Sequence, residues 1–293
     1  AVADNNLGTA YYMAGRLDDA RARLDLALAG FERNQRGDSH HAGNALNNLA
    51  AIAFSQGRLA DAQAYFERAL EVQRRGGGES AALGALTNNL GKLLVLRGDL
   101  ERAQTLLDES LALQTRFVGA DSPDTAFTQL SLGELQLARG ELDAALDSLQ
   151  LARAVFEARL GAGHLFTARA RLVEAQALAR RGEAVRAREG FTEALDALAA
   201  LPGGMPQRLL GGGRCARLQA SLLGWLPAVD SSDVTACEAH AAGLAAGHYE
   251  RLEAELLVAA ARGAPAAERR RLRGALAAAL GEASPRLRVL AGL

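Results

Sequence analysis

Paired asparagines recur at equivalent points of this 293-residue chain, and they are its most suggestive groups for binding chemistry. The three pairs are Asn5 with Asn6, Asn47 with Asn48, and Asn88 with Asn89. Asparagine is a poor residue for a helix interior, because its side chain competes for backbone hydrogen bonds. A side-chain amide both donates and accepts, so a row of amides can pair with an extended peptide backbone. The same amides can instead join neighbouring helices and stiffen them, and both roles stay open.

Groups suited to catalysis or metal binding are sparse. His40 and His41 are adjacent, but no cysteine or carboxylate pair stands at ligand spacing, which favours packing over a metal. Cys237 and His240 lack the second ligand pair of a structural zinc site. A phosphate-binding loop requires a Lys followed by Ser or Thr after its glycines, and the glycines at 211–213 are not followed by this pair. No nucleophile–base pair stands out. We therefore expect no catalytic residue, metal or cofactor in this chain.

Composition narrows the class of protein. A hydrophobic share of 49% with only 4% aromatic residues favours close-packed helices and an all-α fold. The net charge of −1 favours neither nucleic acid nor an anionic membrane as a partner. No apolar run approaches the ~18 residues that cross a bilayer, and no signal segment is present. We expect a cytoplasmic protein in which Cys215 and Cys237 give no disulfide framework.

The elements that position these groups follow from seven glycines at intervals of 39 to 42 residues: Gly15, Gly57, Gly98, Gly140, Gly182, Gly224 and Gly263. A period of this length indicates a stacked repeat array. Glycine ends helices readily, because it adopts the left-handed conformation without strain. The stretch after Gly15 carries apolar residues at helical spacing through Phe31, which predicts a second amphipathic helix. Each repeat is therefore predicted to be a helical hairpin.

Small and large residues recur at fixed places within this hairpin. The first helix carries Leu7-Gly8, Leu49-Ala50, Leu90-Gly91 and Leu132-Gly133, and the second carries Ala20, Ala62, Ala103, Ala145 and Ala187. This pattern resembles the tetratricopeptide repeat. The unit is about eight residues longer than the usual ~34. Its linkers, such as 119–126 and 161–168, are similar to those of the kinesin-light-chain type, although a proline survives only at 123. The resemblance implies a right-handed α-solenoid.

The resemblance also predicts the organisation of the chain. Residues 1–200 form five repeats, at 1–36, 43–75, 84–118, 126–160 and 168–200. Residues 201–293 form degenerate hairpins that cap the array. The chain starts inside the repeat pattern, so we expect it to be a fragment of a longer protein. Because Lys92 is the only lysine among 33 basic residues, a GC-rich bacterial genome is the expected source.

In tetratricopeptide arrays the first helix of each hairpin lines a concave groove. The resemblance therefore implies a partner-binding set of Asn5, Asn6, Asn44, Asn47, Asn48, Asn88, Asn89, Lys92, Phe127, Glu134, Arg169, Gln176 and Arg180. The charged and apolar members can hold one acidic and one apolar ligand side chain. An ordinary solvated face explains the same charges without a ligand.

The function expected from the resemblance is a scaffold that binds a protein or peptide segment, without turnover by this chain. Long repeats of this type often belong to bacterial signalling proteins, and a serine/threonine kinase with an upstream kinase domain is the expected parent. Two alternatives stay open. The repeats can form the peptide-sensing part of a transcriptional regulator, or a structural array that self-associates into a homo-oligomer. Neither nucleic acid nor a membrane is an expected partner of this region.

Overall fold

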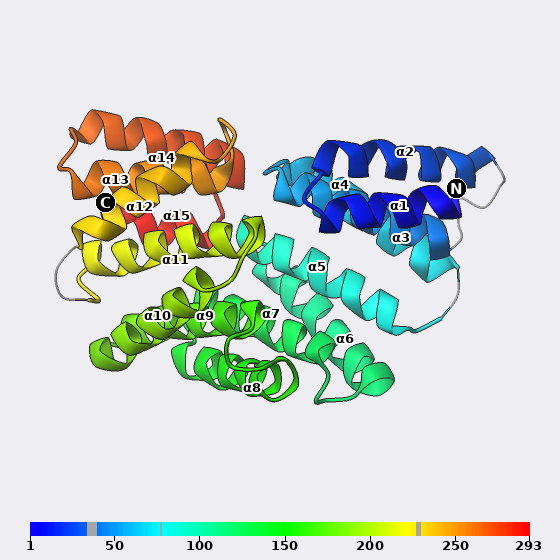
Figure 1. Cartoon of the computed structure of the whole chain (residues 1–293), viewed down its shortest axis with the longest axis horizontal. Coiled ribbons are helices and arrows are strands. Elements are labelled where there is room, and N and C mark those ends of the chain that lie inside the picture. Colours follow the sequence, from blue (N-terminus) through cyan, green and yellow to red (C-terminus); the bar gives the residue numbers. More distant parts are fainter. Residues whose placement is uncertain (34–39, 77, 227–229) are drawn as a thin grey trace.

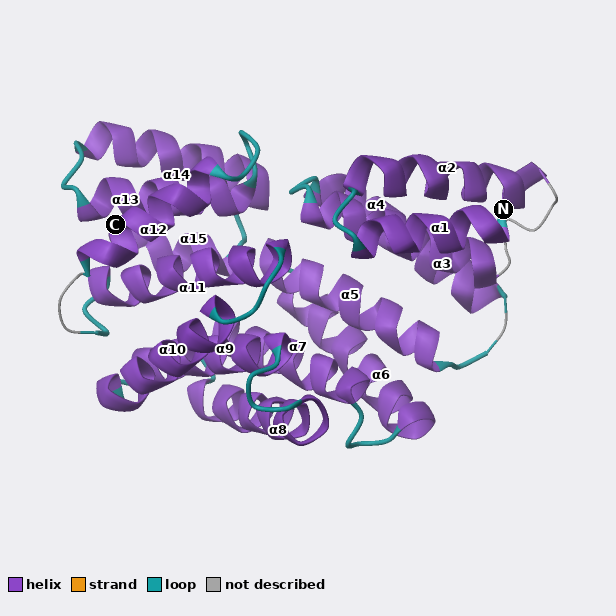
Figure 2. Ribbon diagram, viewed as in Figure 1, coloured by secondary structure: helices purple, strands orange, loops and turns teal. Residues whose placement is uncertain are grey.

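The computed structural model describes residues 1–33, 40–76, 78–226 and 230–293. These residues contain 15 α-helices, a final 3₁₀ turn at Leu290–Gly292, and no strand (Figures 1 and 2). The helices are α1 (Val2–Met13), α2 (Leu17–Arg33), α3 (His40–Ser55), α4 (Leu59–Arg75), α5 (Ala81–Arg97), α6 (Leu100–Val118), α7 (Pro123–Arg139), α8 (Leu142–Leu160), α9 (Leu165–Arg180), α10 (Ala184–Ala199), α11 (Gly204–Leu222), α12 (Ser231–Ala242), α13 (Tyr249–Ala261), α14 (Ala266–Leu280) and α15 (Pro285–Val289). The predicted all-α class is confirmed.

The seven spaced glycines mark the turns between paired helices, as the spacing predicts. All seven have φ between 68° and 88°, a region that side chains with a Cβ rarely adopt. Gly98, for example, ends α5 in the left-handed conformation, and its N–H bonds back to the carbonyls of Leu94 and Val95. The hairpin from α1 to α2 is thus repeated down to the pair α13 and α14 (Figure 1).

Within a hairpin, the small residues allow the two helices to approach closely. A Cβ added to Gly91 would lie 2.8 Å from the side chain of Leu107, and one added to Gly133 would lie 2.6 Å from Leu149. The alanines of the second helix, such as Ala103 and Ala145, are fully buried. The recurring small and large positions are therefore the packing contacts of an α-solenoid.

The linkers between repeats begin the next hairpin through local hydrogen bonds. Ser122 caps α7 by accepting from the N–H of Asp124, and Pro123 occupies the first turn, where its missing N–H costs nothing. The hydroxyl of Thr125 donates to the carbonyl of Gly119 at 2.6 Å, and Thr167 bonds Gly161 in the same way at 2.8 Å. These bonds explain why threonine recurs in the linker. Glycine recurs because Gly119 and Gly161 have φ angles of 93° and 101°, which residues with a Cβ rarely adopt. The linker residues Gly37–Ser39 and Gly77 lie outside the described residues.

The last helices return to the first repeats. Helix α15 contacts α5 and α7, and the hydrophobic core of α2–α6 continues into α13, α14 and the final 3₁₀ turn through residues such as Tyr249 and Leu290. A second core fills α7–α10. Figure 1 shows the blue N-terminal and the orange C-terminal hairpins on the same side of the green repeats. Residues 201–293, which were predicted to form a C-terminal cap, therefore also contact earlier repeats, and we call these interactions with α3, α5 and α7 the closure contact.

The two cysteines were expected to give no disulfide framework, and that expectation is wrong. Cys215 on α11 and Cys237 on α12 form a disulfide. The hairpin brings the two helices together, a proximity that a count of two cysteines does not reveal. The bond also removes Cys237 as a thiolate partner for His240. Among the residues that the structure describes, no group of three or more His, Cys, Asp and Glu side chains is arranged to hold a metal ion.

No helix in the described ranges is both long enough and apolar enough to cross a membrane.

Candidate functional site

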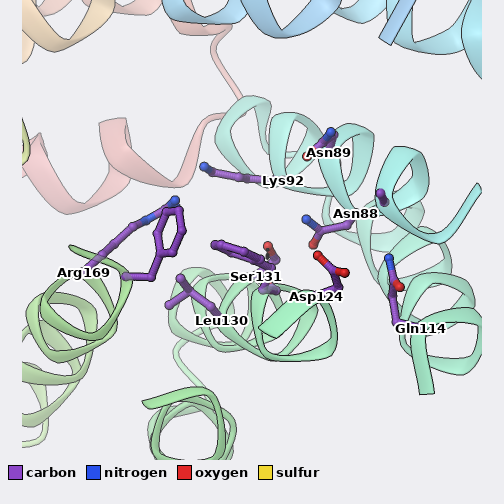
Figure 3. Close-up of a pocket in the computed structure, with 11 residues that line it drawn as sticks. Asn88, Asn89, Lys92, Gln114, Asp124, Leu130, Ser131 and Arg169 are labelled. Atoms are coloured by element: carbon purple, nitrogen blue, oxygen red, sulfur yellow. Dashed lines mark hydrogen bonds between the residues drawn. The ribbon is translucent and has the colours of Figure 1, made fainter. Parts of the chain in front are cut away.

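A cavity of about 260 Å³ lies between the first helices of three successive repeats, α5, α7 and α9. Figure 3 shows polar side chains of α5 facing α7, with Arg169 of α9 at one side. The lining residues are Ala85, Asn88, Asn89, Lys92, Gln114, Asp124, Phe127, Leu130, Ser131, Phe166 and Arg169. Five of them belong to the set predicted from the sequence.

The helical register explains why these residues meet. Asn88 and Lys92 are four residues apart on α5, so they lie on one face, one turn from each other. Phe127 and Leu130 are three apart and present an apolar surface on α7. The result is a cavity in which the amides and ammonium group of α5 lie opposite a wall of α7 that includes the apolar residues Phe127 and Leu130.

Lys92 is a cation without a carboxylate partner. No salt bridge formed by the described residues includes it within 4.0 Å, and its Nζ lies 5.5 Å from the centre of the Phe54 ring. Burial, followed by the neighbouring charge of Arg169, lowers the pKa of Lys92 to about 8. Burial raises the free energy of the charged ammonium group, and an anion that enters the cavity would lower it.

Arg169 is fixed by a carboxylate. Its Nη2 donates to Oε1 of Glu134 at 3.1 Å, between neighbouring repeats. Burial pushes the pKa of Glu134 upwards, but Arg169 and Lys92 together outweigh burial and hold that pKa below its usual value. Glu134 therefore stays ionised and orients the guanidinium at the cavity wall.

Most of the predicted asparagines bond neighbouring helices. Asn89 Nδ2 donates to Asn47 Oδ1 at 3.2 Å, and Asn48 Nδ2 donates to the Thr9 hydroxyl at 3.0 Å. Asn44 Oδ1 accepts from Gln73 on α4 at 3.0 Å. These bonds join successive repeats or the two helices of one hairpin. The stiffening role is thus realised at Asn44, Asn47, Asn48 and Asn89.

Two acceptors at the cavity have no hydrogen-bond partner among the residues that the structure describes. Oδ1 of Asn88 and Oε1 of Gln114 are both buried and unpaired. The Gln114 side chain is only 2% exposed, and its Nε2 is held by the carbonyl of Ala81 at 3.2 Å. A buried acceptor without a partner costs free energy that a donor on a ligand would recover.

The remaining predicted residues lie elsewhere. Asn5 has a buried, unpaired Oδ1 on α1 and Asn6 is exposed, but neither lines the cavity. Gln176 and Arg180 are further along α9 and also lie outside its lining. Arg180 donates to the carbonyl of Leu137 and stacks over the Trp225 ring at 5.8 Å, so it joins α9 to its neighbours.

Sequence reasoning missed Phe166 and Gln114. Phe166 follows the linker before α9, and its ring lies 4.6 Å from that of Phe127 in an edge-on contact. Phe166 was not expected at the cavity because the sequence analysis assigned residues 161–168 to a linker. Gln114 belongs to a second helix, whereas only first helices were expected to line the groove.

The family model for the tetratricopeptide repeat matches residues 1–75 and 81–158. The chain therefore belongs to the tetratricopeptide-repeat family. The matched residues contain α1–α7 and all but the last two residues of α8, and they include two of the three helices around the cavity.

Solved structures share the fold at low sequence identity. The kinesin light chain TPR-like repeats of Podosopora anserina match with a TM-score of 0.54 and 19% identity, over 67% of this chain and 93% of theirs. The Rap protein complexed with competence and sporulation factor matches with a TM-score of 0.67 and 14% identity, over 94% of this chain and 75% of that one. BtubC from P. vanneervenii matches with a TM-score of 0.56 and 15% identity, over 89% and 92%. No curated protein matches the chain.

Proposed function

We propose that this chain is a scaffold that binds a peptide or protein segment in the cavity between α5, α7 and α9. The observation that carries the proposal is a set of groups left without partners at one place: the ammonium of Lys92 and the acceptors of Asn88 and Gln114. They lie beside the apolar surface of Phe127 and Phe166. A peptide supplies N–H donors, a carboxylate and an apolar side chain together, which matches this set.

Preorganisation supplies the affinity. Arg169 is oriented by Glu134, and Asn89 is oriented by Asn47, before any ligand arrives. Side chains that are already held lose little further entropy on binding, so more of the interaction free energy contributes to affinity. The solved Rap structure, which shares the fold, holds a bound factor and supports a binding role.

Selection of peptides from a random displayed library tests this function. Peptides enriched on the purified chain should bind it in calorimetry, and Phe127→Ala should weaken that binding about tenfold by removing an apolar wall. Leu151→Ala is the matched control, because Leu151 is 57% exposed on α8 and remote from the cavity. No enrichment, or equal losses in both variants, would contradict the proposal.

We further propose that the scaffold is the sensor region of a bacterial serine/threonine kinase in the cytoplasm, and that residues 201–293 act as one unit with the five repeats of 1–200. The long repeat and its linker support this reading. The sequence upstream in the gene tests it: a glycine-rich loop and a His-Arg-Asp motif are expected, whereas a helix-turn-helix would favour the transcriptional regulator. The alternative of a self-associating array predicts an oligomer that dissociates on dilution, which light scattering over a dilution series tests.

A further inference from the structure

Histidine caps two helices of this chain, and one of the two rings also reaches a distant repeat. His164 precedes α9 and His248 precedes α13, and in each case Nδ1 accepts from the N–H two residues later at 3.2 Å. The other ring nitrogen of His164 forms no hydrogen bond within the described ranges. Nε2 of His248, in contrast, lies 3.3 Å from the carbonyl oxygen of Ser55, at the end of α3. His248 is therefore part of the closure contact, whereas His164 acts within its own linker.

The bonds of His248 show which ring nitrogen carries the proton of the neutral ring. A ring nitrogen that accepts a hydrogen bond carries no hydrogen, so the proton lies on Nε2. Nε2 therefore donates to the carbonyl of Ser55. Carbonyls in a last helical turn have no partner within their own helix, and the neutral ring supplies one here. A single imidazole thus joins the first turn of α13 to the last turn of α3.

Charged and titratable groups from three helices face this ring. Nη2 of Arg208, on α11, lies 3.2 Å from Nε2. His240 of α12 and Glu250 of α13 also act on the ring, and Tyr249 stacks on it at 5.0 Å between ring centres. Glu250 is the only carboxylate among these groups, and it already forms an ion pair with Arg208 at 2.9 Å. A positive charge on His248 would therefore lack a carboxylate of its own.

The ring is also enclosed by the turn on which it lies. His248 is only 4% exposed, and a Cβ added to Gly57, in the turn after α3, would lie 2.8 Å from its ring. Gly15, at the same turn of the first repeat, has nothing within 4 Å of the equivalent position. The α3 side of the closure contact thus fits this one ring closely.

Protonation would undo these contacts. Burial lowers the pKa of His248 below its usual value; Glu250 opposes this effect, whereas Arg208 and His240 add to it. The ring is therefore neutral at pH 7. At lower pH the second proton goes to Nδ1, which can then no longer accept from the N–H of Glu250. The charged ring would also lie beside the guanidinium of Arg208.

The α5 side of the closure contact is seated through groups that do not titrate near pH 7. The hydroxyl of the fully buried Ser284 donates to the carbonyl of Leu96 at 2.7 Å, in the last turn of α5. A Cβ added to Gly98 would collide with the carbonyl oxygen of Ala283, whereas one added to Gly140, at the next such turn, has nothing within 4 Å. Of these two seats, only the one on α3 is therefore expected to respond to pH.

We propose that His248 is a pH-sensitive latch on the closure contact: as a neutral ring it holds α13 on α3, and when it takes up a second proton it weakens the seating of α13–α15 on the repeats. In the open form the ring is exposed to water and takes up that proton with its ordinary pKa of about 6.5. Protons therefore bind the open form more tightly and favour it as the pH falls. Acidification to pH 5.5 should raise the opening equilibrium about tenfold, since each pH unit below the pKa of the open form contributes a factor of about ten.

The latch also bears on the charges beside the cavity. Glu250 of α13 and Arg286 of α15 both act on Lys92, so opening takes two charges away from that side chain. A change in peptide affinity on acidification would rest on the proposed function. The latch itself does not, because it is measured on the chain without a peptide.

Hydrogen exchange in α15 tests the latch, because a helix of five residues is not stable unless it is packed. The amide of Leu287, which donates to the carbonyl of Ser284 at 3.1 Å, therefore exchanges when the closure contact opens. Its protection factor, which corrects for the effect of pH on exchange chemistry, should fall about tenfold from pH 7.5 to pH 5.5 in the wild type. His248→Asn can still cap α13 but does not titrate, so its protection factor should stay level. His164→Asn is the matched control and should behave as the wild type does.

Three results would overturn the latch. An equal pH response in the wild type and His248→Asn would assign the response to other groups, such as His240. A loss of protection at Glu250 without a loss at Leu287 would show a frayed cap and an intact closure contact. If His248→Asn does not fold, NMR titration of the His248 ring in the wild type decides, with an expected midpoint below about 6.5. A midpoint at or above this value would be the third contradicting result.

Discussion

The inner faces of α3 and α5 carry equivalent residues that serve different purposes. On α3, Asn47 and Asn48 bond side chains of the neighbouring repeats, and Ala51 follows one turn later. On α5, Asn88 occupies the place of Asn47 but keeps an unpaired oxygen, and Lys92 occupies the place of Ala51. The same repeat position can therefore bond a neighbouring repeat, as Asn47 does, or leave an unpaired oxygen beside the cavity, as Asn88 does among the described residues. The difference between Asn47 and Asn88 depends on whether a neighbouring repeat supplies a hydrogen-bond partner for the side-chain oxygen.

The largest effect that separates the two faces is expected at Lys92. Lys92→Met keeps the length of the side chain and removes its charge. Binding of a selected peptide should weaken by about 2 kcal/mol, or ~30-fold, because the ligand carboxylate loses its charged partner. Calorimetry measures this loss. Ala51→Met on α3 is the control, and an equal loss there would show that the α5 face is not special.

The pH dependence of binding sharpens the same contrast. Burial and Arg169 lower the pKa of Lys92 to about 8, so the side chain loses its positive charge between pH 7 and pH 9. Peptide affinity should fall about tenfold over this range in the wild type and stay level in Lys92→Met. The unfolded lysine keeps its proton up to about pH 10.4, so the free energy of unfolding should rise from about pH 8 to pH 10. A flat affinity profile in the wild type would contradict the assignment.

Substitution of two equivalent asparagines should have opposite consequences, one for stability and the other for peptide affinity. Asn47→Ala leaves the amide of Asn89 without its acceptor and should lower the free energy of unfolding by about 1 kcal/mol, with little change in peptide affinity. Asn88→Ala removes an oxygen that has no partner in the free protein, so stability should be retained while affinity falls about fivefold. Chemical denaturation and calorimetry on both variants give the comparison. A loss of affinity in Asn47→Ala with a loss of stability in Asn88→Ala would contradict the roles assigned to these two residues.

The last comparison concerns two turn glycines and the stability of the fold. Gly140→Ala should cost about 1 kcal/mol of stability through backbone strain alone, because no atom lies within 4 Å of the added Cβ. Gly98→Ala should cost more, since Ala283 must move. Thermal denaturation of the two variants measures the difference, and equal costs would mean that the closure contact contributes nothing to stability.

Much of the fold was predictable because it is local. The glycine spacing and the alternation of residues such as Gly91 and Leu107 act within one hairpin, so they can be read from one repeat. Lys92, Phe127 and Arg169, which line the cavity, were expected on the inner face from the resemblance to the family, and their role in binding stays a prediction.

Closure and the disulfide were not predictable from the repeats. The return of α15 to α5 depends on a small rotation at each hairpin that accumulates along the array. The spacing of residues within a repeat does not determine this accumulated rotation, so the contact between Ser284 and Leu96 was not predicted. The partner of Cys215 likewise depends on how α11 and α12 pack.

A crystal structure of the chain with a library-selected peptide is the most direct test of the cavity. The peptide should lie between α5, α7 and α9, with one of its carboxylates within ion-pair distance, about 4 Å, of the Lys92 Nζ. Its N–H groups should face Asn88 and Gln114. A peptide seated outside this cavity, or one whose carboxylate points away from Lys92, would contradict the assignment.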